Sequence, residues 1–223
     1  MKELKHLRKR NEKHFLNDDG TISLYLYNND IHYLKNGEYL DIDNALIEKE
    51  NTIVNKENNF HTSFPKDKST NLLVDITKDN YYLKIYLLKN KNNNTNIKRN
   101  KQDLIFENIL EDIDIDYKVI STKLKESIIL KNKNNIPSSL SFKIDTNLVL
   151  ELATKGSIIA KDKDKNIFVI DAPFMKDNSG SYNYNINYDL NLKDNTYYLN
   201  LDLDQEWLNK AEFPVIIDPT IVN

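Results

Sequence analysis

The chain alternates between apolar and polar residues over most of its length, most clearly near its C-terminal end. From Tyr182 to Leu192 every second residue is apolar or aromatic, and the residues between them are asparagine or aspartate. After a polar break at residues 193–195 the alternation continues from Thr196 to Leu203. Because the side chains of a β-strand point to opposite faces with a period of two, this pattern predicts a long antiparallel hairpin. The side chains expected to face a core are Ile186, Tyr188, Leu190, Leu199 and Leu201.

The same alternation recurs along the rest of the chain and predicts roughly fifteen to seventeen short strands with almost no helix. Strands are expected at residues 21–27, 31–34, 39–42, 60–64, 72–77, 81–88, 104–109, 113–120, 124–130, 140–144, 148–152, 157–160, 167–170 and 213–217. Residues 204–209 are the clearest helical turn, because Asp204 can cap it and Trp207, the single tryptophan, can pack inward. The pattern therefore predicts an all-β fold. We expect an antiparallel β-sandwich, as one large sandwich or two packed ones, with very little helix.

Polar segments indicate how the chain divides. Residues 1–20 are charged with few apolar positions, so we expect an N-terminal arm that is loose or holds a short helix. The β-sandwich region then covers residues 21–218, with a helical or irregular piece after Asn44 and polar residues up to Asn59. The segment 89–101 is almost wholly polar and predicts a mobile loop or a boundary between two lobes. Residues 219–223 are expected to link to a downstream domain.

Composition narrows the classes of function. The 223 residues include 31 basic and 34 acidic side chains, for a formal net charge of −3, and basic residues cluster only in 2–13 and 98–101. Because a nucleic-acid surface usually needs clustered positive charge, the sequence predicts no nucleic-acid partner. The absence of cysteine excludes disulfides, thiolate zinc sites and cysteine catalysis.

The expected location follows from the predicted β architecture, which is typical of secreted proteins. No apolar run approaches the length of a membrane span, and residues 1–20 show no apolar core of a signal peptide. We therefore expect the chain outside the cell, at the cell surface or in a surface-associated assembly, exported without a visible signal peptide. A location in the cytoplasm is the alternative that the sequence leaves open.

Two groups of polar side chains are candidates for chemistry. Asp112, Asp114 and Asp116 alternate with isoleucines and can line one strand face, as in a calcium site or an acid–base pair, but the glycine of a calcium loop is missing. The four histidines do not have the spacing of a zinc motif; they are His6, His14, His32 and His61. We therefore predict no catalytic, cofactor-binding or metal-binding residues, and no cofactor.

Tyrosines suggest a carbohydrate-binding alternative. Aromatic rings on an exposed β face stack on sugars, and the chain has 13 tyrosines. The alternation assigns Tyr184, Tyr188 and Tyr197 to the apolar faces of their strands, where they are expected as core residues. It leaves three others without an assigned face: Tyr81, Tyr82 and Tyr198.

Four segments together resemble a known group of proteins. They are residues 10–21 (RNEKHFLNDDGT), 31–33 with 39–46 (IHY, YLDIDNAL), 106–117 with 124–130 (FENILEDIDIDY, LKESIIL), and 206–208 with 213–220 (EWL, FPVIIDPT). This set resembles the N-terminal β-rich region of Gram-positive wall-associated proteins, Rhs (YD-repeat) proteins and DNRLRE-domain proteins. The resemblance implies a non-enzymatic β module that precedes a further β domain, and it transfers no catalytic residues.

The leading hypothesis is therefore a non-enzymatic structural or interaction module of a bacterial surface, toxin-delivery or phage-like assembly. Its expected partners are other domains of the same polypeptide or assembly proteins, with glycans as a further candidate. The alternative is a carbohydrate-binding module or a relic of a carbohydrate-active enzyme. Glu107 with Glu111 or Glu126 has the residue types of a glycosidase pair, although the spacing does not select these residues.

Overall fold

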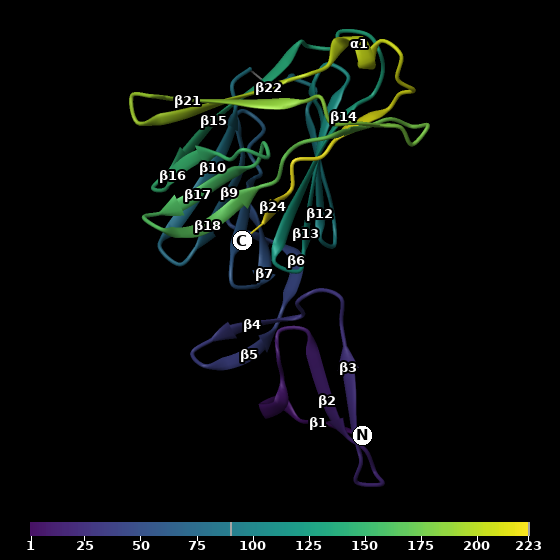
Figure 1. Cartoon of the computed structure of the whole chain (residues 1–223), viewed down its shortest axis with the longest axis vertical. Helices are drawn as coiled ribbons and strands as arrows, with labels where there is room; N and C mark the ends of the chain where they lie inside the picture. The colour runs from purple at the N-terminus through teal and green to yellow at the C-terminus, as the bar shows by residue number, and fades with distance from the viewer. Residues whose placement is uncertain (90, 223) are drawn as a thin grey trace.

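The computed structural model describes residues 1–89 and 91–222 and is built almost wholly of antiparallel strands (Figure 1). In these residues the one α-helix is the four-residue α1 (Gln205–Leu208), and one 3-10 turn, η1, covers Lys5–Leu7. This confirms the predicted all-β class with very little helix. Asn90 of the polar segment and Asn223 of the expected linker lie outside the described residues. Within the described part of the chain, no helix has the length and apolar character needed to cross a membrane.

Two small sheets at the N-terminus extend from the main body (Figure 1). One has the order β1-β2-β3 and the other is a hairpin; their strands are β1 (Lys2–Glu3), β2 (Glu12–Leu16), β3 (Ile22–Leu26), β4 (His32–Lys35) and β5 (Glu38–Asp41). Residues 1–20, expected as an arm, therefore contain two strands. The hairpin turns at Asn36 and Gly37, both with positive φ, as the Asn-Gly pair requires.

Arg8 joins the two small sheets through ion pairs. Its guanidinium donates to both carboxylate oxygens of Glu3 in β1, at 2.8 and 3.1 Å, and to Asp41 in β5 at 2.9 Å. Lys13 of β2 donates to the other oxygen of Asp41 at 2.7 Å. The hydrogen bond from Arg8 lowers the pKa of Glu3, so the network is charged at neutral pH. A buried arginine with two carboxylate partners holds the hairpin against the three-stranded sheet.

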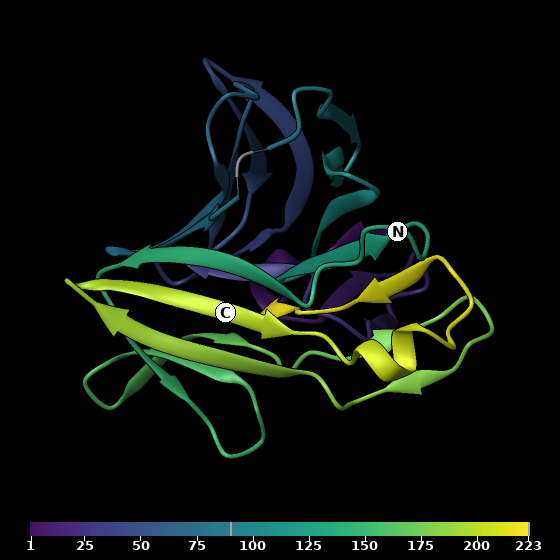
Figure 2. The same ribbon diagram turned by 90° about the horizontal axis from the view of Figure 1, so that it is seen from above.

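Two large sheets form the body (Figures 1 and 2). The eight-stranded sheet has the order β21 (Asn187–Lys193), β22 (Thr196–Asp202), β15 (Ser139–Thr146), β10 (Tyr81–Leu87), β9 (Leu72–Lys78), β8 (His61–Pro65), β7 (Thr52–Glu57) and β6 (Asp43–Lys49). The main path of the second sheet is β11 (Asn96–Asn100), β12 (Asp103–Leu110), β13 (Ile113–Ile120), β14 (Lys123–Leu130), β24 (Ile221–Val222), β18 (Lys165–Ile170), β17 (Ile158–Asp162) and β16 (Val149–Leu152). Beside this path, β23 (Val215–Ile217) pairs with β14 and with β19 (Met175–Lys176), which pairs with β20 (Tyr182–Asn183).

A single hydrophobic cluster contains buried residues of both large sheets, on both sides of the segment 89–101. In this cluster the ring centroid of Tyr117 in β13 lies 5.3 Å from that of Phe64 in β8. It lies 6.2 Å from the ring centroid of Phe106 in β12, in an edge-to-face arrangement. Because Phe64 belongs to one sheet and the other two rings to the second, this contact joins the sheets. The division of the chain near 89–101 and the link to a domain beyond 219 stay predictions.

Strands also occur where the pattern predicted irregular or polar segments. Strand β6 lies in the piece expected to be helical or irregular, β7 in the polar residues before Asn59, β11 in the expected loop, and β24 in the expected linker. The alternating pattern predicts an apolar residue at each buried position of a strand, but in β7 one buried position is occupied by Asn55. Its amide donates to the Phe60 carbonyl at 3.1 Å, and its oxygen accepts the Thr62 N–H at 2.7 Å. Such local bonds satisfy a buried polar side chain, which periodicity does not detect.

The C-terminal hairpin is confirmed where the two strands pair. Tyr188 lies opposite Leu201 and Leu190 opposite Leu199; Leu190 packs partly buried against the core, while Ile186 and the other three are buried. Trp207 also packs against the core as expected, although it is only partly buried. The prediction is wrong from Tyr182 to Asn185, where Asn183 is buried and both tyrosines point outward.

The contact between the sheets predicts the effect of Phe64→Ala. The substitution leaves a cavity beside Tyr117 and should lower the free energy of unfolding by about 3–5 kcal/mol, the usual cost of truncating a large buried aromatic. Urea denaturation followed by fluorescence measures this loss. Ile22→Ala is the matched control, because Ile22 is 55% exposed in β3 and its truncation should change stability by about 0.5 kcal/mol or less. Equal urea midpoints for the two variants would contradict the role assigned to Phe64.

Candidate functional site

A buried carboxyl group, Glu126, lies in β14 behind the C-terminal strands. The hydroxyl of Tyr117 donates to it at 2.8 Å. Burial raises the pKa of Glu126 to about 7, more than the Tyr117 bond lowers it, and the charge of Asp218 raises it further. A carboxyl group with such a pKa is a candidate acid or base in catalysis.

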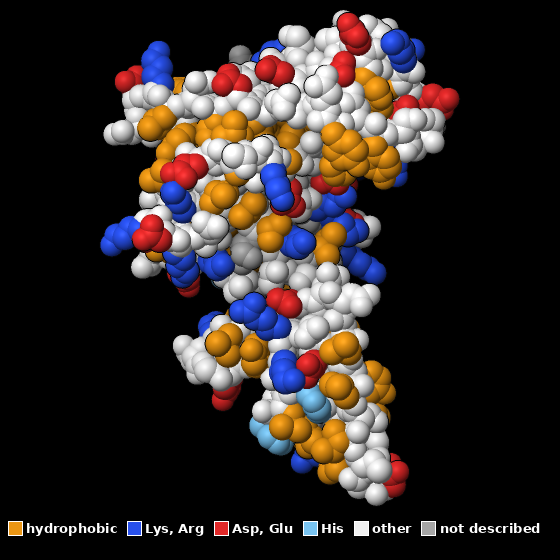
Figure 3. Space-filling model, viewed as in Figure 1, with side chains coloured by type: hydrophobic (Ala, Val, Ile, Leu, Met, Phe, Trp, Pro, Cys, Tyr) orange, Lys and Arg blue, Asp and Glu red, His pale blue; other side chains and the backbone are white. Residues whose placement is uncertain are grey.

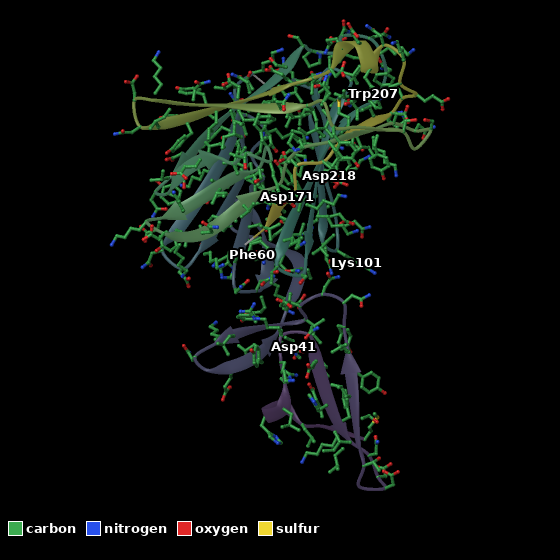
Figure 4. The ribbon with its side chains drawn as sticks, viewed as in Figure 1. Asp41, Phe60, Lys101, Asp171, Trp207 and Asp218 are labelled. Carbon is green, nitrogen blue, oxygen red and sulfur yellow. The ribbon has the colours of Figure 1, made fainter. Side chains whose placement is uncertain are left out.

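The space around Glu126 is too small for a substrate. The cavity that Glu126 lines with Tyr188 and Ile221 has a volume of about 20 Å³, which is enough for a single water molecule. Asp171 and Asp218 lie near each other in Figure 4; Asp171 is exposed, and Lys125 holds the Asp218 carboxylate at 2.6 Å. We therefore interpret Glu126 as part of the packing of the body.

An aromatic platform on the surface is the accessible candidate site. It consists of Phe174, Tyr182 and Tyr184, each within about 6 Å of the other two between ring centroids (5.7, 6.1 and 6.2 Å). The two tyrosine rings are almost parallel, with 9° between their planes, and Tyr182 is 50% and Tyr184 73% exposed. Hydrophobic side chains gather on this side of the surface below helix α1 (Figure 3). Exposed rings held this close together are typical of a binding surface.

Hydrogen bonds behind the platform explain why the tyrosines face outward. The amide of Asn183 donates to the carboxylate of Asp204 at 3.0 Å, and its oxygen accepts the Asn185 N–H at 2.6 Å. The same carboxylate accepts the backbone N–H of Trp207 at 3.0 Å and so caps α1. This hydrogen bond lowers the pKa of Asp204 to about 2. Because Asn183 is drawn inward, its neighbours at 182 and 184 must point to the other side.

Two lysines and a hollow border the platform. The Nζ of Lys176 lies 5.2 Å from the centre of the Tyr182 ring. Beside Phe174 and Tyr184 is an open hollow of about 570 Å³, formed with the turn at 153–156 and with Lys155. This volume falls within the range of about 300–1,000 Å³ that small-molecule sites occupy. Flat rings, a cation and a hollow together suit a ligand with aromatic and anionic groups.

The residues singled out from the sequence lie elsewhere and do not form one site. Asp112 is in a turn, Asp114 pairs with Lys131 at 2.7 Å, and burial is the main cause that raises the pKa of Asp116. Among the described residues, no three His, Cys, Asp or Glu side chains are grouped so that they would hold a metal ion. Of the histidines, His32 is buried and its ring Nδ1 lies 2.7 Å from the Lys9 carbonyl.

Of the three tyrosines without an assigned face, two are held by carboxylates, and Tyr198 lies between Lys143 and Asn191 of the neighbouring strands. Tyr81 donates to Asp162 at 2.7 Å and Tyr82 to Asp145 at 3.3 Å. Tyr184, expected in the core, is instead the most exposed ring of the platform. The sequence indicates the outward direction of Tyr184 only weakly. The turn Asn178-Ser179-Gly180 precedes Tyr182, and after a turn the buried face of a strand can begin at either of two neighbouring residues.

Three curated proteins are similar to this chain over 96% of its length. They are the "tRNA3(Ser)-specific nuclease WapA" of Bacillus spizizenii and the "tRNA nuclease WapA" of Bacillus subtilis, each 24% identical, and the "tRNA(Glu)-specific nuclease WapA" of Bacillus subtilis subsp. natto, 25% identical. The chain spans 10% of the length of each relative. No protein-family model and no solved structure matches it.

These comparisons overturn several expectations from the sequence. The relatives are named nucleases, so the interpretation as a non-enzymatic module, with a carbohydrate module as alternative, was wrong. The exclusion of a nucleic-acid partner was wrong as well, because the names give tRNA as what the relatives act on. Assignment to the Rhs and DNRLRE-domain group is also overturned, since no family model matches.

The raised pKa of Glu126 predicts how stability depends on pH. Because the folded state binds this proton more tightly than the unfolded chain, whose carboxyl pKa is near 4.5, the contribution of Glu126 is complete below that pH and is lost as the pH rises through about 7. The loss amounts to about 3 kcal/mol. In Glu126→Gln, urea denaturation should therefore show a smaller loss of stability between pH 5 and pH 8 than in the wild type.

The matched control for this experiment is Glu107→Gln. Glu107 is on the surface, where the hydrogen bond from Lys98 lowers its pKa, so its replacement should not reduce the loss of stability over this range. A Glu126→Gln variant with the same pH dependence as the wild type would contradict the assignment.

Proposed function

We propose that this chain takes part in RNA recognition within a nuclease that acts on tRNA. The observation that carries the proposal is the similarity of nearly the whole chain to three proteins named as tRNA nucleases. Since the chain spans a tenth of their length, the proposal assigns cleavage to the complete protein and assigns to this chain a contact with RNA.

The aromatic platform supports this assignment. RNA offers flat bases beside a phosphate backbone. Tyrosine and phenylalanine rings stack on such bases with about 1–3 kcal/mol per base, and lysines contact the phosphates. The platform and its two lysines provide both types of contact on one open surface.

The expected location at a bacterial surface is also part of this proposal. The motifs at residues 10–21 and 213–220, which resemble segments of wall-associated proteins, support it. Fractionation of the native host, with detection by an antibody against this chain, tests the location.

The proposed function predicts that the complete protein cleaves tRNA and that the chain of 223 residues binds it. The complete reading frame that encodes the chain is expressed and incubated with end-labelled total tRNA, and the products are separated on a denaturing gel. In parallel, the chain is titrated into labelled tRNA and into duplex DNA of similar length as the control. We expect cleavage by the complete protein and preferential binding of tRNA by the chain. Intact tRNA in the first assay together with no tRNA binding in the second would refute the proposal.

A further inference from the structure

We propose that the platform of Phe174, Tyr182 and Tyr184, with the hollow beside it, binds unpaired nucleotides and does not bind base-paired RNA. This inference rests on the proposed function and specifies which part of the RNA the chain contacts. In a duplex the faces of the bases are covered by their neighbours, so only an unpaired base can stack on a protein ring. The loops and the 3′ end of a tRNA offer such bases.

The geometry of the rings favours successive bases. Tyr182 and Tyr184 are two residues apart on one face of the chain, and their planes differ by only 9°. Phe174 approaches both at angles of 41° and 44° and supports them from the side. The two rings stack on each other and Lys176 lies over the Tyr182 ring, so the more exposed ring of Tyr184 continues the stack toward an extended strand of RNA.

The scaffold holds the platform before any ligand binds. Strand β20 pairs with β19, Lys176 lying opposite Tyr182, and β19 pairs with β23 of the large sheet. The turn that precedes Tyr182 is fixed by Asp177, whose carboxylate accepts the Ser181 N–H at 2.9 Å and the Glu212 N–H at 3.1 Å. Rings on such a rigid base lose little conformational freedom when a ligand binds, which favours affinity.

The hollow adds a place for the neighbouring nucleotide. It is lined by the apolar residues Leu152, Pro173 and Ile186 and by the polar residues Thr154 and Asn187. Phe174 and Tyr184 line both the hollow and the platform, so a strand that stacks on the rings leads directly into it. Apolar walls with a few polar groups suit a base and its sugar.

The charges near the platform indicate that stacking supplies most of the affinity. Lys155 and Lys176 are the two cations at the site, and the chain as a whole carries a formal charge of −3. With two phosphate contacts on a single strand, the logarithm of the binding constant should fall with the logarithm of the salt concentration with a slope of about −1.4 or less steep. A basic groove that binds any RNA would give a much steeper slope.

The experiment compares one short RNA in two states. The chain is titrated into a fluorescein-labelled single-stranded RNA and into the same RNA annealed to its complement, with fluorescence anisotropy as readout. We expect the single strand to bind and the duplex to bind far more weakly. Tyr184→Ala and Tyr182→Ala should each weaken binding of the single strand by at least about fivefold, the loss of one stacked base. Tyr184→Phe keeps the ring and should bind like the wild type.

Tyr27→Ala is the matched control, because Tyr27 is also an exposed tyrosine but lies directly after β3 of the small N-terminal sheet. It should leave RNA binding unchanged. The platform variants should keep the circular dichroism and melting temperature of the wild type, since the two tyrosines are exposed.

The outcomes separate this inference from the proposed function. If the chain binds tRNA but the platform variants bind it equally well, or if duplex and single strand bind equally, the inference fails while the proposed function stands. If the chain binds neither tRNA nor the single strand, both fail. Binding of a glycan in place of RNA, lost in Tyr184→Ala, would also overturn the inference.

Discussion

The contact of Tyr117 with both large sheets is the interaction on which the rest of the structure depends. Its ring packs against Phe64 of one sheet and Phe106 of the other, and its hydroxyl donates to Glu126 in the neighbouring strand β14. Strand β14 in turn pairs with β23, β23 with β19, and β19 with β20. The position of the platform on the surface therefore follows, strand by strand, from the packing at Tyr117. The buried Glu126 is the hydrogen-bond partner of the Tyr117 hydroxyl. Its raised pKa reflects the free-energy cost of burying a charged carboxylate.

The platform exists because two constraints compete over the same segment. Apolar periodicity favours burial of Tyr182 and Tyr184, but the bonds of Asn183 to Asp204 and Asn185 favour burial of the asparagine. A strand cannot do both, since adjacent side chains point to opposite faces. The charged carboxylate of Asp204 also caps α1, so reversing the segment would expose Asn183 and remove its amide donor from the carboxylate that caps the helix. The rings are exposed as a result.

At the other end of the molecule, too, polar contacts hold a surface element in place. Arg8 holds the hairpin β4–β5 to the sheet β1–β3, and these small sheets extend from the body with few buried apolar residues of their own. The molecule thus combines an apolar body with surface elements that polar contacts hold in place. Of these anchored surface elements, the platform of Phe174, Tyr182 and Tyr184 is the one for which contact with RNA is proposed.

The sequence by itself determined the fold class, because alternation with a period of two leaves no other way to bury the apolar rows than in antiparallel sheets. It also determined the pairing of β21 with β22. Only the tertiary structure decided the direction of Tyr182 and Tyr184, since the partner of Asn183 is Asp204, 21 residues away in sequence. The pKa of Glu126 was likewise decided by burial under strands that are remote in sequence. The alternation of apolar and polar residues indicates only which face of a strand each segment prefers to bury by itself. The direction of the two tyrosines and the pKa of Glu126 instead arise from contacts between segments that are distant in sequence.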